Sequence, residues 1–486
     1  MSLAGRPLLP APEPGNVWTG LRLGRPRQAW NLEDDDLHAE RQRALDAVLT
    51  AVVPAACILA PPVARHPWRL AVRDQDASAV LQSLSQLPAH WEIREERHPR
   101  RITARPRLAA GGRPLPQIPD LEVVLDVLRH DGGQYLGDAV GTFARVDAED
   151  WDAQSMRSLH TEGRLLSAPA PSMPIDLVYT WVDGADPRWR ERRDAALRAQ
   201  GSAGARAHDS AVDESRYLDS EELRYSLRSV HRYASWVRRI HLVTDGQLPH
   251  WLVPGHPLIN VVDHQTLLGG SRFNSHAIES ALHRIPGLAE HYLYLNDDVF
   301  FGRIAYPEDF FAAPGISRFF PSDLPIDPGP ATGEDLPLMA AAKNGRDLIS
   351  ARFDLEVRTK LRHTVHPQQR AVAEQIEAEH PAEVAATRSA LFRSATDLSL
   401  ASSLHHWYAY ALRRAVPAQP NYLYVNLASP QVGQTLDALE SLRRYDTFCL
   451  NQEQAPASAA TRHELSTHLR RYLPTPAPWE RPEQRS

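Results

Sequence analysis

"HYLYLNDDVFF", residues 291–301, has the pattern of a buried strand that ends on two carboxylates. The four residues after His291 favour a pleated, apolar setting, and apolar residues resume directly after Asn296, Asp297 and Asp298. Adjacent carboxylates between apolar flanks repel each other and are costly to desolvate. A divalent cation bound to a diphosphate would neutralise them. The structural alternative is that Asp297 caps the next turn while Asp298 is solvated.

Three other short apolar runs of the chain also end on an acid. They are residues 175–183, 240–245 and 259–263, which close on Asp183, Asp245 and Asp263. Helical patterns lie between the runs, so we expect βαβ units and an α/β fold with a mostly parallel sheet covered by helices on both faces. In such a sheet, ligands bind outside the carboxyl ends of the strands. We therefore expect the strand-end acids to converge on one crevice.

The composition is that of an ordinary globular protein. The length of 486 residues suggests two to four domains, and the formal net charge of −6 offers no electrostatic surface for nucleic acid. Only Cys57 and Cys449 are present, which favours two reduced thiols in a cytosolic protein over a single long-range disulfide. The most apolar window, 47–64, carries three prolines, and no signal peptide is visible. We expect a soluble, cytoplasmic protein.

Composition along the chain also predicts the domain organisation. The first part of the chain is expected to comprise an irregular arm (1–33), a small N-terminal α/β domain (34–166) and a linker (167–174). A larger α/β domain with all the strand-end acids follows (175–470); it contains a helical insert over about 345–415 and a helical C-terminal part. The last expected part is a disordered tail (471–486).

"YTWVDGADPRW", residues 179–189, follows the first of these strands. Asp183 and Gly184 form a tight-turn signal, and glycine allows the backbone to approach a ligand closely. Trp181 is able to stack on a base or a sugar, but a tryptophan in a strand is more often part of the core. Taken alone, this stretch favours core packing.

Two predicted helices carry further candidate side chains. Arg224 and Arg228 lie four residues apart on one helical face, where their guanidinium groups can hold phosphate oxygens or pair with a neighbouring glutamate. Asn274, Ser275 and Glu279 lie at the start of another helix, where polar groups are ordinarily capping or dipole partners. The spacing decides neither case.

"RHTVHPQQR", residues 362–370, contains two histidines three residues apart, His363 and His366. This spacing is compatible with metal ligation, but no matching cysteine or Glu-x-x-His partner accompanies it, so a structural zinc site is not expected. A single histidine that acts as a general base is the more economical interpretation.

Together these motifs resemble the Stealth family, which comprises bacterial capsular polysaccharide phosphotransferases related to the animal enzyme that places N-acetylglucosamine 1-phosphate on lysosomal glycoproteins. The family has four sequence blocks, and stretches similar to all four lie between about residues 175 and 452. They are "IDLVYTWVDGADPRW" (175–189), the region from "SRYLDSEELRYSLRSV" to "YLYLNDDVFF" (215–301), "RHTVHP" with "TRSALFRSATDLSLA" (362–401), and "TFCLN" (447–451).

The resemblance implies a core like that of nucleotide-sugar transferases and the transfer of a hexose 1-phosphate, such as an N-acetylhexosamine 1-phosphate. The donor would be a UDP-sugar and the acceptor a hydroxyl of a glycan; a phosphodiester would form and UMP would leave. Mg²⁺ or Mn²⁺ is the implied cofactor. The implied setting is capsule or cell-surface polysaccharide synthesis, which leaves open a peripheral association with a membrane assembly complex at the inner face of the plasma membrane.

The resemblance also implies roles for single residues. Asp297, Asp298 and Asn451 fall in the metal and diphosphate site, and His366 matches the expected base. Arg393 is expected to be catalytic with Asp298, and either Arg224 or Arg393 spreads the charge of the phosphate. The residues expected to bind substrate are Thr180, Trp181, Val182, Asp183, Gly184, Arg224, Asn274, Ser275, Glu279 and Asp397.

The chain departs from the family pattern at two positions. Gln452 stands where the fourth block usually continues with an aspartate, which removes one acid from the implied metal site, and Val365 replaces a proline before His366. Two rival functions therefore remain: a metal-dependent glycosyltransferase that releases UDP, and a glycan-binding relative without catalysis.

Overall fold

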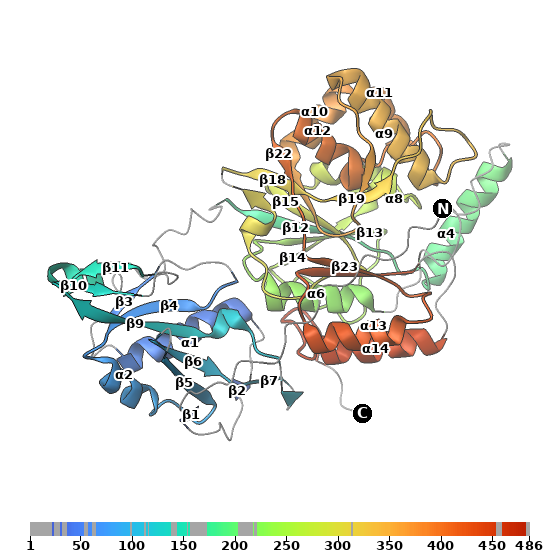
Figure 1. Ribbon diagram of the computed structural model, residues 1–486. Helices are drawn as coiled ribbons and strands as arrows, with labels where there is room; N and C mark the ends of the chain where they lie inside the picture. Colours follow the sequence, from blue (N-terminus) through green and yellow to red (C-terminus); the bar gives the residue numbers. More distant parts are fainter. Residues whose placement is uncertain are drawn as a thin grey trace, which may run out of the picture. The chain divides into compact units, whose positions relative to one another are not determined.

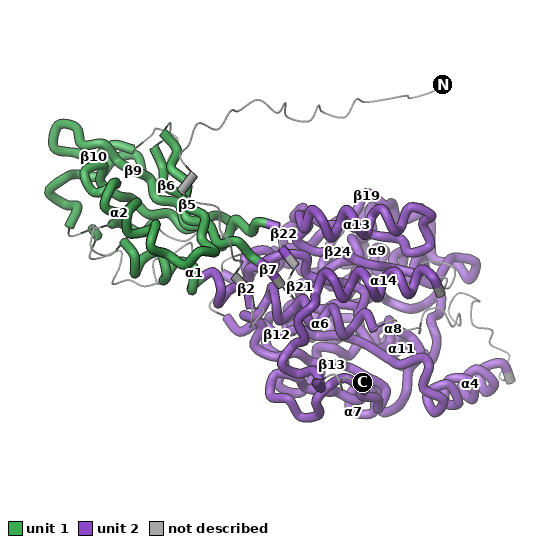
Figure 2. The backbone as a smooth tube through the Cα atoms, turned by 90° about the horizontal axis from the view of Figure 1, so that it is seen from below, with its two compact units in different colours: residues 1–30, 42–108, 117–165 green, residues 31–41, 109–116, 166–486 purple. Residues whose placement is uncertain are grey.

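The chain forms two compact units, shown in Figure 2. The first comprises residues 1–30, 42–108 and 117–165, and the second comprises residues 31–41, 109–116 and 166–486. The computed structural model describes residues 36–52, 57–60, 65–97, 100–110, 116–137, 143–152, 173–202, 221–312, 314–452 and 459–482, together with 22–23, 30–31, 113–114, 154–155 and 217. Most of the predicted arm and most of the predicted linker lie outside these residues; the described parts of the arm are residues 22–23 and 30–31.

The first unit is built on a mixed sheet whose strands run in the order β1-β5-β6-β9-β10-β11, with β4 and β3 attached through β9. The strands are β1 (Arg22–Leu23), β3 (Cys57–Leu59), β4 (Trp68–Arg73), β5 (Trp91–Arg97), β6 (Arg100–Pro106), β9 (Val123–Asp131), β10 (Gln134–Leu136) and β11 (Arg145–Asp147). Apolar residues of α1 (Leu37–Val52) and α2 (Ala77–Leu84), such as Val48 and Val80, share one core with this sheet.

The central sheet of the second unit has the order β14-β13-β12-β15-β21. The strands are β12 (Ile175–Thr180), β13 (Ile240–Thr244), β14 (Ile259–Asp263), β15 (His291–Asn296) and β21 (His366–Gln369). The first four strands of this order are parallel, and β21 pairs antiparallel with β15 at the edge. The prediction of an α/β fold with a mostly parallel sheet is therefore confirmed.

Helices cover both faces of this sheet (Figure 1). Successive side chains of a strand point to opposite faces. On one face, the Tyr179 hydroxyl lies 2.6 Å from Ser226 Oγ of α6 (Glu222–Tyr233). On the other, Val178 and Tyr294 share a buried cluster with Ile278 of α8 (Ser275–Glu279). Buried apolar residues on both faces explain why these strands read as continuous apolar runs.

A second, three-stranded sheet continues from β15. After a turn at Asp297 and Asp298, β16 (Val299–Phe301) pairs antiparallel with β24 (Thr447–Asn451). Strand β24 in turn pairs in parallel with β23 (Tyr422–Asn426). Because of this pairing, β24 ends beside the two adjacent acids.

The remaining elements of the second unit surround these two sheets (Figure 1). They are α4 (Pro187–Ser202), α7 (His264–Leu268), α9 (Pro337–Phe353), α10 (Arg370–Glu379), α11 (Pro381–Ser389), a π-helical segment (Leu400–Leu404), α12 (His405–Ala411), α13 (Val432–Leu442), α14 (Ala459–Tyr472), β17 (Phe311–Ala312), β18 (Ile316–Phe319), β19 (Pro321–Pro325), β20 (Thr359–Leu361) and β22 (Ala415–Pro417). Short strands β2 (Trp30–Asn31), β7 (Leu108–Ala110) and β8 (Arg113–Pro114) form a separate small sheet.

The prediction of a disordered tail from residue 471 is wrong for residues 471–482. Helix α14 ends at Tyr472, and the segment after it buries Leu473, Trp479 and Glu480. The Glu480 carboxylate accepts hydrogen bonds from Arg224 and Arg228 of α6. Proline-rich composition indicated disorder, but buried apolar side chains, the Glu480 carboxylate and backbone hydrogen bonds to Trp251 and Val253 hold this segment in place.

The described part of the chain holds no helix with the length and apolar content that crossing a bilayer requires.

Candidate functional site

The order of the central sheet reverses direction at β12. Strands β13 and β14 follow on one side of β12, and β15 lies on its other side. Thr180, the last residue of β12, is in register with Asn296, the last residue of β15. Ligands of open α/β sheets bind beyond the carboxyl ends of the strands at such a point. The adjacent acids Asp297 and Asp298 directly follow this position.

Asp298 is the centre of a compact polar group. Its Oδ1 lies 3.1 Å from His363 Nε2, and its Oδ2 accepts hydrogen bonds from Asn451 Nδ2 at 2.9 Å and from Cys449 Sγ at 3.3 Å. The structure thus brings two of the expected metal ligands, Asp298 and Asn451, into contact. It adds His363, which the sequence analysis considered only as a metal ligand together with His366, and Cys449, for which only a reduced thiol was expected.

Asp298 and His363 perturb each other's titration. Burial raises the pKa of Asp298, but the charge and hydrogen bond of His363, with the Cys449 and Asn451 donors, more than offset this and hold the pKa below its ordinary value. Burial likewise lowers the pKa of His363, and the negative charges of Asp298, Asp297 and Glu279 outweigh it, so this pKa is raised. The pair therefore favours an ionised carboxylate beside a basic imidazole.

His366, the histidine predicted to be the base, does not face Asp298. It begins β21, where it pairs with Tyr294, and its Nδ1 lies 3.1 Å from His406 Nε2. Burial, with the charges of His363 and His405, lowers the pKa of His366 to about 3. The residues after it in β21 include the buried Gln368 and Gln369. Because these residues are polar, the sequence shows no apolar strand pattern here, and β21 was not predicted.

A second polar group joins the start of α8 to the segment that follows α11. Asn274 caps α8 and donates a hydrogen bond to Asp397 Oδ2 at 2.9 Å. Asp397 also lies 3.2 Å from His276 Nδ1, and Arg393 Nη2 donates to Ser275 Oγ at 2.7 Å. Four of the predicted site residues thus lie in one group, in which Asn274 and Asp397 are buried.

The Tyr294 hydroxyl is affected by charges near both polar groups. It lies 3.2 Å from Thr180 Oγ1, at the end of β12. Burial raises its pKa, and the charges of Glu279 and Asp297 raise it further, while Arg393 opposes them. The Tyr294 hydroxyl is therefore hydrogen-bonded to Thr180 and is affected by the charges of Glu279, Arg393 and Asp297.

The turn after β12 is packed against protein rather than open to a ligand. A Cβ atom on Gly184 would lie 2.1 Å from the Tyr217 carbonyl oxygen, so the predicted close approach is to the Tyr217 backbone. Trp181 is buried, in agreement with core packing, and Val182 packs against a cluster around Trp189.

Asp183 belongs to the same turn. Its carboxylate accepts a hydrogen bond from the Ala185 N–H at 2.8 Å, and the Gln247 side chain bonds both its backbone N–H and its carbonyl oxygen.

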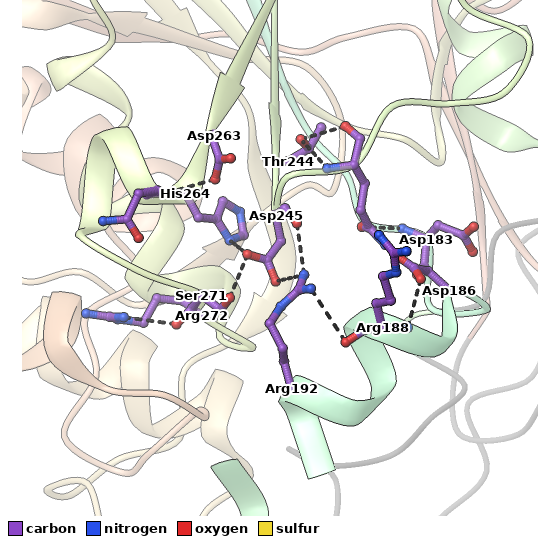
Figure 3. Close-up of polar contacts among 12 residues, drawn as sticks. Asp183, Asp186, Arg188, Arg192, Thr244, Asp245, Asp263, His264, Ser271 and Arg272 are labelled. Carbon is purple, nitrogen blue, oxygen red and sulfur yellow. Dashed lines mark hydrogen bonds and ion pairs between the residues drawn. The ribbon is translucent and has the colours of Figure 1, made fainter. Parts of the chain in front are cut away.

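Two other strand-end acids also have protein partners, as Figure 3 shows. Asp245 accepts hydrogen bonds from Arg192 Nη2 at 2.9 Å and from Ser271 Oγ at 2.8 Å. Asp263 caps α7 by accepting from the Gln265 N–H at 2.9 Å. Both carboxylates therefore already have hydrogen-bond donors from the protein, and their predicted convergence with Asp297 and Asp298 on one crevice stays a prediction.

Arg224 also has a partner within the protein. Its Nε donates to Glu480 Oε2 at 2.7 Å, and Arg228 Nε donates to Oε1 of the same carboxylate at 2.6 Å. Both guanidinium groups are buried. The predicted role of Arg224 in phosphate binding has no support from this arrangement, since its charge already has a buried carboxylate partner.

Among the described residues, one set of three side chains has ligand atoms close enough together to hold a metal ion. It consists of Asp298, His363 and Cys449, whose ligand atoms all lie within 4.8 Å of one another.

Models of all four Stealth conserved regions match the chain. Region 1 matches residues 173–201, region 2 matches 216–319, region 3 matches 362–410 and region 4 matches 437–486. These ranges contain every residue of the two polar groups.

Curated relatives carry the name exopolysaccharide phosphotransferase. One from Streptomyces coelicolor is 45% identical over 320 residues, which are 64% of this chain and 53% of the relative. A second from that organism is 37% identical and covers 72% of this chain and 65% of the relative. The CpsY protein of Mycobacterium tuberculosis is 41% identical, with 63% and 58% covered. The chain thus spans about half to two thirds of the length of these relatives.

Solved structures similar to this chain include a galactosyltransferase, LgtC, in complex with donor and acceptor sugar analogues. It is 10% identical with a TM-score of 0.31, and the match covers 60% of this chain and 95% of that one. The bifunctional glycosyltransferase WbbM is 8% identical, also with a TM-score of 0.31, over 68% of this chain and 60% of that one.

Proposed function

Because the chain belongs to the Stealth family, we propose that it is a phosphotransferase of polysaccharide synthesis that moves a hexose 1-phosphate from a UDP-sugar to a hydroxyl of an acceptor glycan. The acceptor oxygen bonds to the phosphorus that carries the donor sugar, the bond from that phosphorus to UMP breaks, and UMP leaves. The product is a sugar phosphodiester. We place the reaction on the cytoplasmic side of the membrane, with a peripheral contact to the assembly complex.

The observation that carries this proposal is the group around Asp298 at the carboxyl ends of β12 and β15. An ionised carboxylate, a second acid beside it and a basic imidazole lie where an α/β sheet binds its ligands. Phosphoryl transfer needs little covalent help from the protein; it needs positioning and charge compensation, which these side chains can supply.

The donor set fits the expected Mg²⁺ or Mn²⁺. Asp297 and Asp298 offer hard carboxylate oxygens. Asn451 turns its amide Nδ2 toward Asp298, so its amide oxygen would become a ligand after rotation of the side-chain amide. When bound, the cation would supply positive charge that stabilises the departing UMP. With Gln452 at the next position, Asp297 and Asp298 would supply the whole carboxylate charge of the site.

His363, rather than His366, is the better candidate for the general base. A carboxylate only accepts hydrogen bonds, so His363 Nε2 donates its hydrogen to Asp298 and the lone pair of the neutral ring lies on Nδ1. In our proposal Nδ1 takes the proton of the acceptor hydroxyl, while Asp298 orients the ring and stabilises the imidazolium. The His363 side chain is 32% exposed, which leaves it accessible to an acceptor.

The second polar group supports the transferred phosphate. Arg393 is held by Ser275 Oγ, and the neighbouring Asn274 and Asp397 fix the segment from which it projects. A guanidinium in this position spreads the charge that develops on the phosphate oxygens. Thr180 and Glu279, near the Tyr294 hydroxyl, are then the groups that meet the donor sugar.

The test is to incubate the protein with a panel of UDP-sugars, a glycan acceptor and Mg²⁺ or Mn²⁺. We expect UMP release and a phosphodiester signal in ³¹P spectra, and loss of both in Asp298→Asn. Asp347→Asn is the matched control, because its carboxylate is 51% exposed and paired only with neighbouring Arg346. UDP as the sole nucleotide product would instead establish a glycosyltransferase, and no turnover with any donor would favour a binding protein.

A further inference from the structure

The proposed transfer leaves one side chain of the Asp298 group without a role. Cys449, in the middle of β24, is fully buried, and its thiol donates a hydrogen bond to Asp298 Oδ2 at 3.3 Å. His363 Nε2 lies 3.2 Å from the same oxygen. An oxygen, a nitrogen and a sulfur therefore converge from three distant segments of the chain.

The spacing of these atoms suits a small tetrahedral cation. Metal bonds of about 2.0–2.3 Å to Asp, His and Cys ligands place neighbouring ligand atoms of a tetrahedron roughly 3.5 Å apart. Asp298 Oδ2 lies 3.2 Å from His363 Nε2 and 3.3 Å from Cys449 Sγ, both close to this separation, and all three ligand atoms lie within 4.8 Å of one another. Small side-chain rotations are enough to complete the site.

The chemistry of the donors selects the class of cation. Mg²⁺ prefers six oxygen ligands, whereas a thiolate and an imidazole favour zinc and related borderline cations. Three protein ligands leave the fourth position of a zinc site open. The cation has a way in, because the side chains of Asp298 and His363 are 17% and 32% exposed.

We propose that Asp298, His363 and Cys449 form a binding site for a thiophilic divalent cation, of which Zn²⁺ is the type, and that its occupancy switches off the transfer reaction. Binding replaces the proton of the Cys449 thiol, which passes to solvent, and the ring of His363 ligates through Nε2. The neutral ring then carries its hydrogen on Nδ1, so Nδ1 is unable to accept a proton from a hydroxyl. This regulatory consequence rests on the proposed function, whereas the binding itself does not.

Cobalt provides a direct test of the binding, because a thiolate bound to Co²⁺ gives a near-ultraviolet charge-transfer band. Titration of the full chain with Co²⁺ is expected to develop this band to saturation at one ion per chain. The two cysteines supply a matched pair of variants. Cys57→Ser, in β3 of the other unit, is expected to retain the band and Cys449→Ser to lose it. Absence of the band in the unaltered chain, or an equal band in Cys449→Ser, would overturn the site.

A second variant covers the case in which Cys449→Ser does not fold. His363→Gln changes a partly exposed side chain and leaves the thiol in place. Removal of an outer-shell partner typically costs about 10–100-fold in metal affinity, so loss of a ligand is expected to weaken Co²⁺ binding by at least about tenfold. Unchanged affinity in a folded His363→Gln protein would exclude the imidazole and contradict the proposal.

The regulatory consequence has its own readout. Zn²⁺ at a concentration that displaces Co²⁺ is expected to stop UMP release in the unaltered protein and in Cys57→Ser, and to leave Cys449→Ser at its own zinc-free rate. If Zn²⁺ displaces Co²⁺ but does not slow UMP release, the proposed switch is wrong and the proposed binding site is retained. If no donor gives turnover, the proposed function fails, but the cobalt titration still decides the site.

Discussion

At the residue scale, two histidines three positions apart have opposite surroundings. His363 lies before β21 and faces Asp298, which raises its pKa. His366 lies inside the sheet, against Tyr294 and His406, and burial lowers its pKa to about 3. A base must be reachable by the substrate and basic enough to hold a proton. His363 meets both conditions, and His366 meets neither.

We therefore predict that His363→Gln lowers kcat, whereas His366→Gln lowers stability. Loss of a general base typically costs about 10²–10⁴-fold, and we expect kcat of His363→Gln to fall within this range with little change in KM. His366→Gln should act through stability and retain most of kcat. The measurement is UMP release under donor saturation, with folding monitored by circular dichroism. A large loss of kcat in folded His366→Gln beside an active His363→Gln would reverse the assignment.

The same scale shows what single residues in a sequence can predict. Asp298 and Asn451 could be placed together only through the family resemblance, which puts both residues in the implied metal site. Gly184 and Arg224 could not be assigned: their residue types suit a ligand, but their partners, Tyr217 and Glu480, lie far along the chain. A sequence motif gives the type of a residue, but it does not show which other residue of the chain already contacts that side chain.

At the element scale, the segment after α14 is tied to α6 by a buried carboxylate. Glu480 accepts hydrogen bonds from Arg224 and Arg228, and donors of this strength hold its pKa below the ordinary value against the effect of burial. We predict that Glu480→Ala destabilises the protein by about 3–5 kcal/mol, because it leaves two guanidinium groups buried without their shared partner. Urea unfolding measures this loss.

The matched control replaces all three side chains by apolar ones. A triple variant with Arg224→Met, Arg228→Met and Glu480→Leu is expected to recover most of the lost stability, since buried ion pairs are often replaced at little cost. If Glu480→Ala alone were as stable as the unaltered chain, the tie between these two elements would not contribute to folding.

Strand β21 and helix α12 hold a row of buried histidines. Burial lowers the pKa of His405 to about 4, and burial with the charges of His366 and His405 lowers that of His406. In the unfolded chain a histidine titrates near 6.5. Between about pH 6.5 and 4 the unfolded state therefore binds more protons than the folded state, so acidification lowers stability.

We predict that the free energy of unfolding falls as pH drops from 7 to 5, by up to about 1.4 kcal/mol per pH unit for each such histidine. His405→Gln removes one of the protons that the unfolded state binds in excess of the folded state. The dependence of the unfolding free energy on pH should therefore become shallower by up to about 1.4 kcal/mol per pH unit. The exposed His463→Gln is the control and should leave it unchanged. Urea midpoints across this range measure the slope, and a stability independent of pH would contradict the prediction.

The elements themselves were predictable to different degrees. Periodicity identified the apolar strands β12, β13, β14 and β15, because burial on both faces leaves a continuous apolar run. It missed β21, whose buried glutamines bond to partners such as the Ala401 carbonyl and Ser317. It also missed the order of the segment after α14. Both depend on polar contacts that no local pattern records.

At the scale of the whole molecule, the chain consists of two compact units, and all residues of the candidate site belong to the second. The boundaries and functions of the domains proposed from sequence stay predictions. The physical consequence of two cores is that unfolding need not be a single two-state transition. A ligand that binds only the folded second unit stabilises that unit alone.

We therefore predict that calorimetry resolves two unfolding transitions and that UDP-sugar with Mn²⁺ shifts one of them. At about a hundredfold excess over Kd, binding adds about 2.7 kcal/mol, which corresponds to an upward shift of roughly 4 °C for a unit of this size. Asp298→Asn should abolish the shift without moving the other transition, because its carboxylate is part of the proposed metal site and not of the first unit's core. If both transitions move together on ligand addition, the two units do not unfold independently; if neither moves, the second unit does not hold the donor.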